Sequence, residues 1–548
     1  MKRFYFLTLI ILSVLTSYAK ERSLSEKMQA AQMALLNHGT YAKAQVKAAP
    51  FALKLIKQTP QLSIIGNGNQ GYAVIANDDQ YDAVLGYSKT AYSDVMPDGL
   101  LWWLTEMDKA LAAAKAESHN YLQDGDYKAA VEPLIGTTWG QGSPYNNLCP
   151  NRYPSGCVAT AMSQIMWYHK YPEHGVGSIM DFGKVIFVDF SSTTYDYANM
   201  LTAYTDNQYT TKQGDAVATL MYHCGIASNM KYASSGSGTT TIDAVQALKK
   251  YFSYNKNVCV KFRDYNSTAD WMQMVYTELS NGRPILYGAN DKVSGGHAFV
   301  FEGYDADGKV YVNWGWDGTA NGYYNIDLLA PIGTDYSFTE SQDMILGIAK
   351  PEVDIAHSPN IVANDDLDIS VSAGKLVFNW YKNFAAYNLY DYTFQGAIYL
   401  VAQDGNGNYT ELWGGDFSDV KSLNGGTFNK KFTIDDELNT LADGKYTLKL
   451  MFAEDGYDGV FPVTYPEGKI KAYTLTKAGS NLSLSEGSTT GISQVSTSAS
   501  QSSPYTYIYN MQGQEIYKAP TASFRLSDVP ANGILIVKQG NTVKKIVK

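Results

Sequence analysis

The sequence predicts a multidomain α+β protein that ends in strand-rich modules. Its 548 residues exceed one domain of ordinary size, because most domains have roughly 100–200 residues. Helix-like and strand-like segments mix as far as residue 350, and short strand-like runs between Gly, Asn and Asp turns follow. With 45% hydrophobic and 18% charged residues, the composition is that of a globular protein.

Residues 1–19 have the pattern of a signal peptide. Lys2 and Arg3 precede an apolar run at 4–15, and small residues lead to Ala19. The run is shorter than the roughly 20 apolar residues of a spanning helix, and no later segment is longer. We therefore expect a chain that is exported by the Sec pathway, is cut after Ala19 and has no membrane span.

A first α+β domain is predicted over residues 20–128. Helix-like periodicity at 23–36 is followed by strand-like runs at 61–65 and 71–76, which a Gly-Asn turn separates. A second helix is expected at 99–117, where Ala, Leu and Lys are frequent.

Cys157 lies at the predicted start of a helix in the second domain, residues 129–350. Gly156 precedes it, and apolar residues at 158, 162, 165 and 166 follow at helical spacing. Unpaired amides and the positive end of the helix dipole favour a thiolate in a first helical turn, as a cysteine nucleophile requires. A buried structural cysteine fits the same pattern.

His297 opens a predicted hairpin directly after two glycines, so little covers its ring. An imidazole close to a thiol can take its proton, although a lone histidine is often a core residue. The return strand carries Asn313, Trp314 and Trp316. If the hairpin loop has an even number of residues, the two tryptophans share the face of His297. If the number is odd, Asn313 shares that face. The sequence leaves open which of them orients the ring.

Three motifs in this order resemble the streptopain/interpain family of cysteine proteases. They are Ser-Gly-Cys-Val-Ala-Thr-Ala-Met-x-Gln-Ile-Met at 155–166, Gly-Gly-His-Ala-Phe-Val at 295–300 and Val-Asn-Trp-Gly-Trp-x-Gly at 312–318. The resemblance covers roughly residues 40–350. It implies a papain-like protease domain at 129–350 and an inhibitory propeptide at 20–128.

The resemblance also implies roles for individual residues. Cys157 would be the nucleophile, His297 the base, and Gln141 an oxyanion donor beside the Cys157 backbone N–H. Gln141 lies 16 residues before Cys157, in a longer loop than papain has. No metal and no cofactor is expected. The remaining implied residues are Asn313, Trp314 and Trp316 beside the base, and Ser237 and Gly296 in contact with substrate.

Beyond residue 350 the sequence predicts β modules only. Residues 351–485 have the strand and turn spacing of an immunoglobulin-like β-sandwich. A Ser/Thr-rich linker is expected at 486–504. Residues 505–548 resemble the C-terminal sorting domain of type IX secretion cargo, through Tyr-Asn-Met-Gln-Gly-Gln-Glu-Ile-Tyr at 509–517 and Gly-Ile-Leu-Ile-Val-Lys at 533–538.

The other cysteines and the Asp-Gly loops are expected to be structural. Cys149, Cys224 and Cys259 lack metal-ligand spacing, and with Cys157 free at most one disulfide can form, for which Cys224–Cys259 is a candidate. The runs at 305–308 and 404–408 lack the downstream Glu of a calcium-binding EF-hand and are predicted to be turns.

The expected function is that of a secreted cysteine endopeptidase, made as a zymogen, that hydrolyses proteins or peptides through an acyl-enzyme. Its own propeptide would be an intramolecular inhibitor. Two alternatives remain: a surface adhesin with a catalytically inactive protease-like scaffold, and an acyl transferase that uses the same dyad. The net charge of −10 argues against a nucleic-acid partner.

Overall fold

The computed structural model describes three regions and a set of short C-terminal strands. The predicted signal peptide and residues 489–504 of the predicted linker lie outside the described residues. Within the described part of the chain, no helix combines the length and the apolar character needed to cross a bilayer. The described residues are 20–37, 53–67, 71–113, 120–181, 186–205, 208–291, 295–329, 342–364, 367–380, 385–457, 459–466, 471–488, 505–509, 515–520, 529, 534–539 and 542–547.

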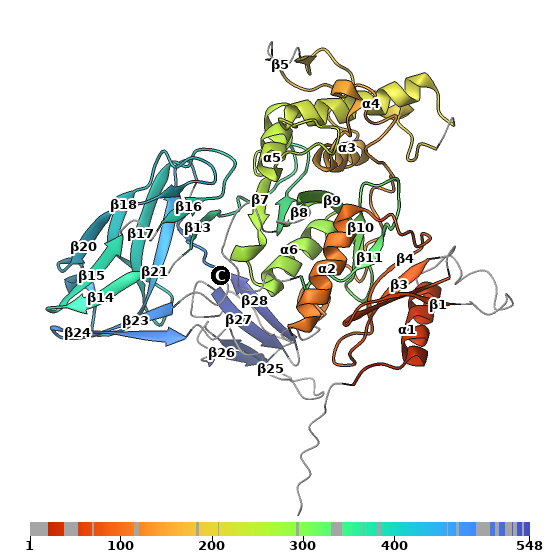
Figure 1. Cartoon of the computed structure of the whole chain (residues 1–548). Coiled ribbons are helices and arrows are strands. Elements are labelled where there is room, and N and C mark those ends of the chain that lie inside the picture. Colours follow the sequence, from red (N-terminus) through yellow and green to blue (C-terminus); the bar gives the residue numbers. More distant parts are fainter. Residues whose placement is uncertain are drawn as a thin grey trace, which may run out of the picture.

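One ten-stranded sheet runs through the first two regions (Figure 1). Its order is β1-β2-β3-β4-β11-β10-β9-β8-β12-β7, and the nine neighbouring pairs are all antiparallel. The N-terminal region (residues 20–128) supplies four strands, and the central region (residues 129–350) supplies six. The strands are β1 Lys54–Gln58, β2 Leu62–Gly66, β3 Tyr72–Ala76, β4 Val84–Ser88, β7 Cys259–Phe262, β8 Ile285–Asp291, β9 Gly295–Tyr304, β10 Val310–Asn313, β11 Gly322–Tyr324 and β12 Gln342–Leu346.

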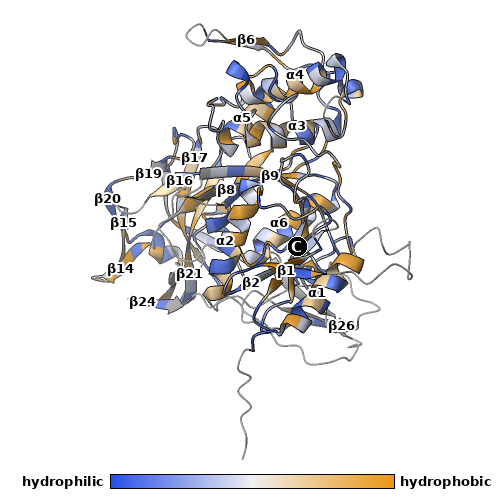
Figure 2. Cartoon of the chain, turned by 45° about the vertical axis from the view of Figure 1, so that its right-hand side comes forward, coloured by the Kyte–Doolittle hydropathy of each residue, from blue (hydrophilic) through white to orange (hydrophobic). Residues whose placement is uncertain are grey.

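Helices cover both faces of this sheet. Helices α3, α4 and α5 form one layer, and their core contains Ala298 and Val300 of β9. Helices α2 and α6 share the opposite core with Phe299 and Phe301. In Figure 2 the helices carry both apolar and polar residues, as expected of helices that pack one side onto a sheet. The bounds are α1 Leu24–Asn37, α2 Asp98–Ala112, α3 Cys157–His169, α4 Thr211–Ala227, α5 Thr241–Lys250 and α6 Thr268–Ser280. A separate hairpin pairs β5 Ser178–Asp181 with β6 Ile186–Asp189.

The predicted β-sandwich follows the central region. Its two main sheets, β14-β15-β20 and β18-β17-β21-β23-β24, enclose one apolar core. The last of these strands ends at Ser488, so the sheet extends past the expected boundary at residue 485. The strands are β13 Ile361–Ala363, β14 Asp368–Ser372, β15 Lys375–Trp380, β16 Ala386–Asn388, β17 Gly396–Gln403, β18 Tyr409–Asp416, β19 Gly425–Gly426, β20 Lys430–Ile434, β21 Gly444–Glu454, β22 Phe461–Pro462, β23 Lys471–Ala478 and β24 Asn481–Ser488.

The C-terminal residues form a four-stranded antiparallel sheet of order β26-β25-β27-β28. Its strands are β25 Tyr505–Tyr509, β26 Glu515–Pro520, β27 Ile534–Gln539 and β28 Thr542–Val547. They fall where the sequence predicts short hairpin strands.

The predicted helices and strands of the N-terminal region agree with the structure to within a residue, with one exception, whereas strands β1 and β4 were not predicted. Helix α2 ends at Ala112, whereas the sequence predicts a helix that runs to residue 117, and residues 114–119 lie outside the described part. Strands β2 and β3 occupy the predicted runs.

Candidate active site

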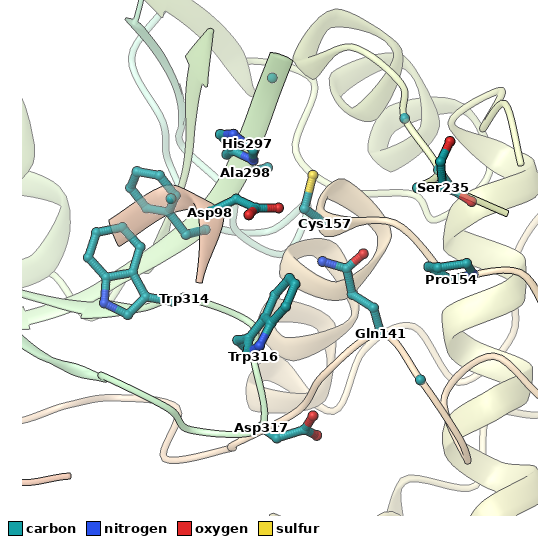
Figure 3. Close-up of a pocket in the computed structure, with 17 residues that line it drawn as sticks. Asp98, Gln141, Pro154, Cys157, Ser235, His297, Ala298, Trp314, Trp316 and Asp317 are labelled. Carbon is teal, nitrogen blue, oxygen red and sulfur yellow. The ribbon is translucent and has the colours of Figure 1, made fainter. Parts of the chain in front are cut away.

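A cavity of about 650 Å³ lies where strand β9 meets the first turns of helices α2 and α3 (Figure 3). Seven of the eight residues predicted from the sequence line it, and Asn313 does not. The lining residues are Asp98, Gly99, Gln141, Gly142, Pro154, Cys157, Ser235, Gly236, Ser237, Gly238, Gly296, His297, Ala298, Phe299, Trp314, Trp316 and Asp317.

Cys157 is the first residue of α3, as predicted. Gly156 before it has a φ of 91°, a conformation that favours glycine. A Cβ on Gly156 would also lie 2.7 Å from the side chain of Met230 and 2.9 Å from the carbonyl oxygen of Ser237. Glycine is therefore required here, because it lets the loop at 235–238 approach the start of the helix.

The Cys157 thiol has a raised pKa, which is opposite to the direction expected from its place at a helix start. Burial is the main cause, and the Asp98 carboxylate adds to the increase. The backbone N–H groups of Ala298, Val158 and Cys157 itself favour the thiolate but do not outweigh burial. In the full chain, the neutral thiol is therefore the favoured form.

A β-bulge decides which residues share the face of His297. Val310 pairs with Tyr304 near the turn, and an uninterrupted ladder would then pair Asn313 with Phe301. Instead, Asn313 pairs with Val300, because the register shifts by one residue between Tyr311 and Val312. The loop at 305–309 has an odd number of residues, which by alternation alone would place Asn313 on the face of His297. The bulge reverses this and places Asn313 on the opposite face.

Trp314 consequently lies on the His297 side of the hairpin. Its ring packs 4.7 Å from that of Phe299, two residues after His297, and its Nε1 donates to the carbonyl of Ala320 at 3.0 Å. The Trp314 ring also supports α2, since a Cβ on Gly99 would lie only 2.9 Å from it. Trp314 is thus buried between β9 and the start of α2.

Asn313 faces the other side and is fully buried. Its Nδ2 donates to the carbonyl of Thr137 at 2.7 Å and to Oε1 of Gln164 on α3 at 3.1 Å, while its Oδ1 accepts from the N–H of Gly315 at 3.1 Å. The amide therefore ties the return strand to the helix that carries Cys157.

Gln141 reaches the cavity from the long loop before α3. Figure 3 shows its amide directed toward Cys157. The loop is closed by the N–H of Ser155, which donates to the Gln141 carbonyl at 3.1 Å. On the same side, Ser237 is held by the N–H of Ala233, which donates to its Oγ at 3.3 Å. Both predicted polar contributors therefore lie on loops anchored by hydrogen bonds.

Sequence analysis missed the acidic residues of the cavity. Asp98, at the start of α2, directs its carboxylate toward Cys157 in Figure 3. The carboxylate of Asp317 lies against Gly140, where a Cβ would be 2.5 Å from it. The position of Asp317 next to Trp316 is a signal that could have found it, whereas Asp98 has no local signal.

The remaining cysteines and acidic loops are structural. All four cysteines are free, so the candidate Cys224–Cys259 bridge is not formed. At 404–408 the Asp404 carboxylate accepts from the N–H groups of Asn406 and Asn408, which makes this run a turn. No group of His, Cys, Asp and Glu side chains within the described ranges could hold a metal ion.

A thiol, an imidazole and an amide donor around one cavity are the groups that nucleophilic attack on a carbonyl requires. In such an attack a thiol can supply the nucleophile, an imidazole can accept and return a proton, and an amide can donate to the oxygen on which charge develops.

Comparisons with known proteins agree with this chemistry. The model of the Peptidase C10 family matches residues 139–324. A solved structure of a Prevotella intermedia prointerpain A fragment is 40% identical, with a TM-score of 0.50, and the match covers 54% of this chain and 98% of that one. Streptopain of Streptococcus pyogenes is 29% identical over 312 residues, which are 51% of this chain and 78% of streptopain.

The thiol protease/hemagglutinin PrtT of Porphyromonas gingivalis is 29% identical over 382 residues, or 62% of this chain. The match spans only 43% of the length of PrtT.

Proposed function

Because the chain belongs to the Peptidase C10 family of cysteine peptidases, we propose that it is an endopeptidase made as a zymogen, with Cys157 and His297 as its catalytic dyad. The observation that carries this proposal is the single cavity that Cys157, His297 and Gln141 line together. The proposed substrates are proteins and peptides.

In the proposed reaction, His297 takes the proton of the Cys157 thiol, and the thiolate attacks the carbonyl carbon of the scissile peptide. The oxygen then carries negative charge, which the Gln141 side-chain amide and the Cys157 backbone N–H stabilise. One such donor contributes about 10²–10³ in rate. His297 next protonates the leaving amine, and water hydrolyses the thioester to release the acyl portion and restore the thiol.

The neighbours of the hairpin are positioning residues in this scheme. Trp314 fixes the His297 side of the hairpin by packing on Phe299 and keeps water from it. Asn313 acts through the backbone, because its amide bonds to Thr137, Gln164 and Gly315. We therefore assign the orientation of the ring to the Trp314 side of the hairpin.

The N-terminal region is the proposed inhibitor. Its helix α2 brings Asp98 and Gly99 into the cavity, where a substrate would lie. The Asp98 carboxylate also adds to the raised pKa of the thiol. Removal of α2 would admit substrate and water to the cavity and would lower the pKa of Cys157. The same event would therefore open the site to substrate and favour the thiolate of Cys157.

Maturation is proposed near residues 128–131, which are bonded to the central region. Val131 and Tyr304 exchange backbone hydrogen bonds at 2.9 Å, and the hydroxyl of Tyr304 donates to the carbonyl of Lys128 at 2.8 Å. A protease needs its substrate in extended form within a cleft, so these bonds must open before the chain is cut here. Export by the Sec signal and then by a type IX route completes the proposal.

The test is expression of the wild type and of Cys157→Ala, followed by mass spectrometry under reducing conditions. We expect the wild type to lose about 12 kDa as the N-terminal region leaves, an estimate from its length at ordinary residue mass, and Cys157→Ala to stay at full length. Iodoacetamide should label Cys157 stoichiometrically and abolish casein cleavage.

The alternatives give different results. A wild type that neither processes nor hydrolyses casein would favour a binding protein, and products joined to an added amine would favour acyl transfer.

A further inference from the structure

Three residues form a row across the central sheet beside the cavity. Gly288 on β8 pairs with Ala298 on β9 on one side and with Asp343 on β12 on the other. Residues that pair directly across a sheet project to the same face. Ala298 lines the cavity, so the row leads from the cavity wall to Asp343.

The Asp343 side chain leans along this row toward the cavity wall. A Cβ built on Gly288 would clash with Oδ1 of Asp343, so the carboxyl group packs into the space that the missing side chain of Gly288 leaves. Neighbouring strands are about 4.8 Å apart, which places the carboxyl group within one strand spacing of Ala298.

The Asp343 carboxyl group is buried and incompletely bonded. The residue is 3% exposed, and no group in the described part of the chain donates to its Oδ1. Thr241 at the start of α5 donates to the carboxyl group, and burial raises its pKa to about 7. An unpaired buried charge is costly, so a cation that entered from the cavity would stabilise the ionised form.

The face to which the row projects can be compared with the face that carries His297. His297 must face the leaving amine, and it projects to the same sheet face as Phe299, which packs on Trp314. Ala298 projects to the opposite face, and both Ala298 and the loop at 235–238 line the cavity. Because His297 is expected to face the leaving amine, we expect the part of the substrate before the scissile bond to extend toward Ala298 and Asp343.

We propose that Asp343 is the acidic end of a subsite that begins at Ala298 and selects a Lys or Arg side chain from the acyl portion of the substrate. The charges around the cavity are consistent with a basic substrate side chain. Within the described residues, the lining includes Asp98 and Asp317 but neither Lys nor Arg. This inference rests on the proposed function and adds a substrate class to it.

The test uses the self-processed full chain and fluorogenic peptides that carry Arg, Lys, Leu or Glu at each of the three positions before the scissile bond. We expect Arg or Lys to exceed Leu in kcat/KM at one position. Asp343→Asn should lower kcat/KM for that basic substrate at least about tenfold, as the loss of a buried charge partner does, and leave the Leu substrate within about threefold.

Asp215→Asn is the charge-matched control, because Asp215 is exposed on α4. It should keep the preference for a basic residue. Should Asp343→Asn fail to fold, replacing Arg by citrulline in the best substrate makes the same comparison on the wild type, with the same tenfold loss expected.

A preference for Leu over both basic residues at all three positions would overturn the inference. So would an Asp343→Asn variant with an unchanged preference, or a citrulline peptide cleaved as well as the Arg peptide. These outcomes leave cleavage that depends on Cys157 intact, whereas the absence of any such cleavage would overturn the proposed function as well.

Discussion

Backbone strand pairing joins the central region to the N-terminal region. The contacts of the central region with the β-sandwich are made by side chains. On the first side, strands β4 and β11 pair at three positions, and Tyr87 stacks on Tyr323 at 5.2 Å. On the second side, Lys249 pairs with Asp391 at 2.7 Å, and Nδ2 of Asn360 donates to the carbonyl of Val260 at 2.9 Å.

The two contacts also differ in their relation to the cavity. Helix α2 of the N-terminal region contributes Asp98 and Gly99 to the cavity lining, and no described residue of the β-sandwich lines it. Loss of the first contact should therefore change the chemistry of Cys157, whereas loss of the second should change stability alone. The three predictions below separate these effects.

The largest effect on the reactivity of Cys157 is expected for Gly99→Val, which forces α2 away from the cavity. A Cβ at Gly99 would lie 2.9 Å from the Trp314 ring and 3.0 Å from the Phe299 ring. Overpacking of this kind costs about 1–3 kcal/mol, so alkylation of Cys157 by iodoacetamide should become roughly tenfold faster. Rates are measured by mass spectrometry in a His297→Ala background, which prevents self-processing. Leu101→Ala, on the exposed side of α2, should leave the rate unchanged.

Asn360→Ala should weaken the second contact without changing hydrolysis. The Asn360 side chain is buried and donates to the carbonyls of Val260 and Leu389, and its Oδ1 accepts from Lys261 at 3.2 Å. Leaving these groups unpaired should lower the free energy of unfolding by about 2–4 kcal/mol. Calorimetry measures this loss, and peptide hydrolysis should stay within about twofold of the wild type.

Asn424→Ala, at an exposed site in the β-sandwich, is the control for this variant. A parallel fall in hydrolysis and stability would show that the two contacts do not differ in the way described.

The smallest effect is expected for Asp98→Asn, which removes charge and keeps shape. Burial and the Asp98 carboxylate both raise the pKa of Cys157, so loss of the carboxylate should lower that pKa while burial still holds it above its ordinary value. The pH profile of alkylation should move to lower pH, with a rate at pH 7 that is a few times higher. Glu106→Gln on the same helix is the control, and an identical profile for both variants would contradict the role of Asp98.

The positions of Cys157 and His297 were predictable because their signals are local. A glycine followed by helical spacing marks the start of α3, and two glycines before alternating apolar residues mark β9. Gln141, Ser237 and Gly296 were anticipated on the cavity wall only through the family resemblance. The loops of Gln141 and Ser237 carry no periodic pattern, and Gly296, in β9, has no side chain that indicates its role.

The choice between Asn313 and the tryptophans could not be made from the sequence, because a bulge leaves no reliable mark in a strand. The five-residue loop between Tyr304 and Val310 is odd and, by alternation alone, predicts Asn313 on the His297 side. The bulge reverses that assignment. Its extra residue, Glu302, accepts from the N–H groups of Ile135 and Gly136 at 3.0 and 3.3 Å, long-range partners that a sequence does not reveal.

Asp98 and Asp343 were missed for a related reason. Each reaches the cavity or its wall through tertiary packing, and nothing in the sequence of its own helix or strand distinguishes it from other acidic residues.

The ladder between β4 and β11 has a consequence for the proposed maturation. If the N-terminal region departs, the N–H and C=O groups of Gly322–Tyr324 that pair with β4 become an open sheet edge. The released fragment would carry the complementary strand, so we expect that it could bind again and inhibit the enzyme in trans. Lasting activation would then depend on dilution or degradation of that fragment, and concentrated preparations should lose activity as it accumulates.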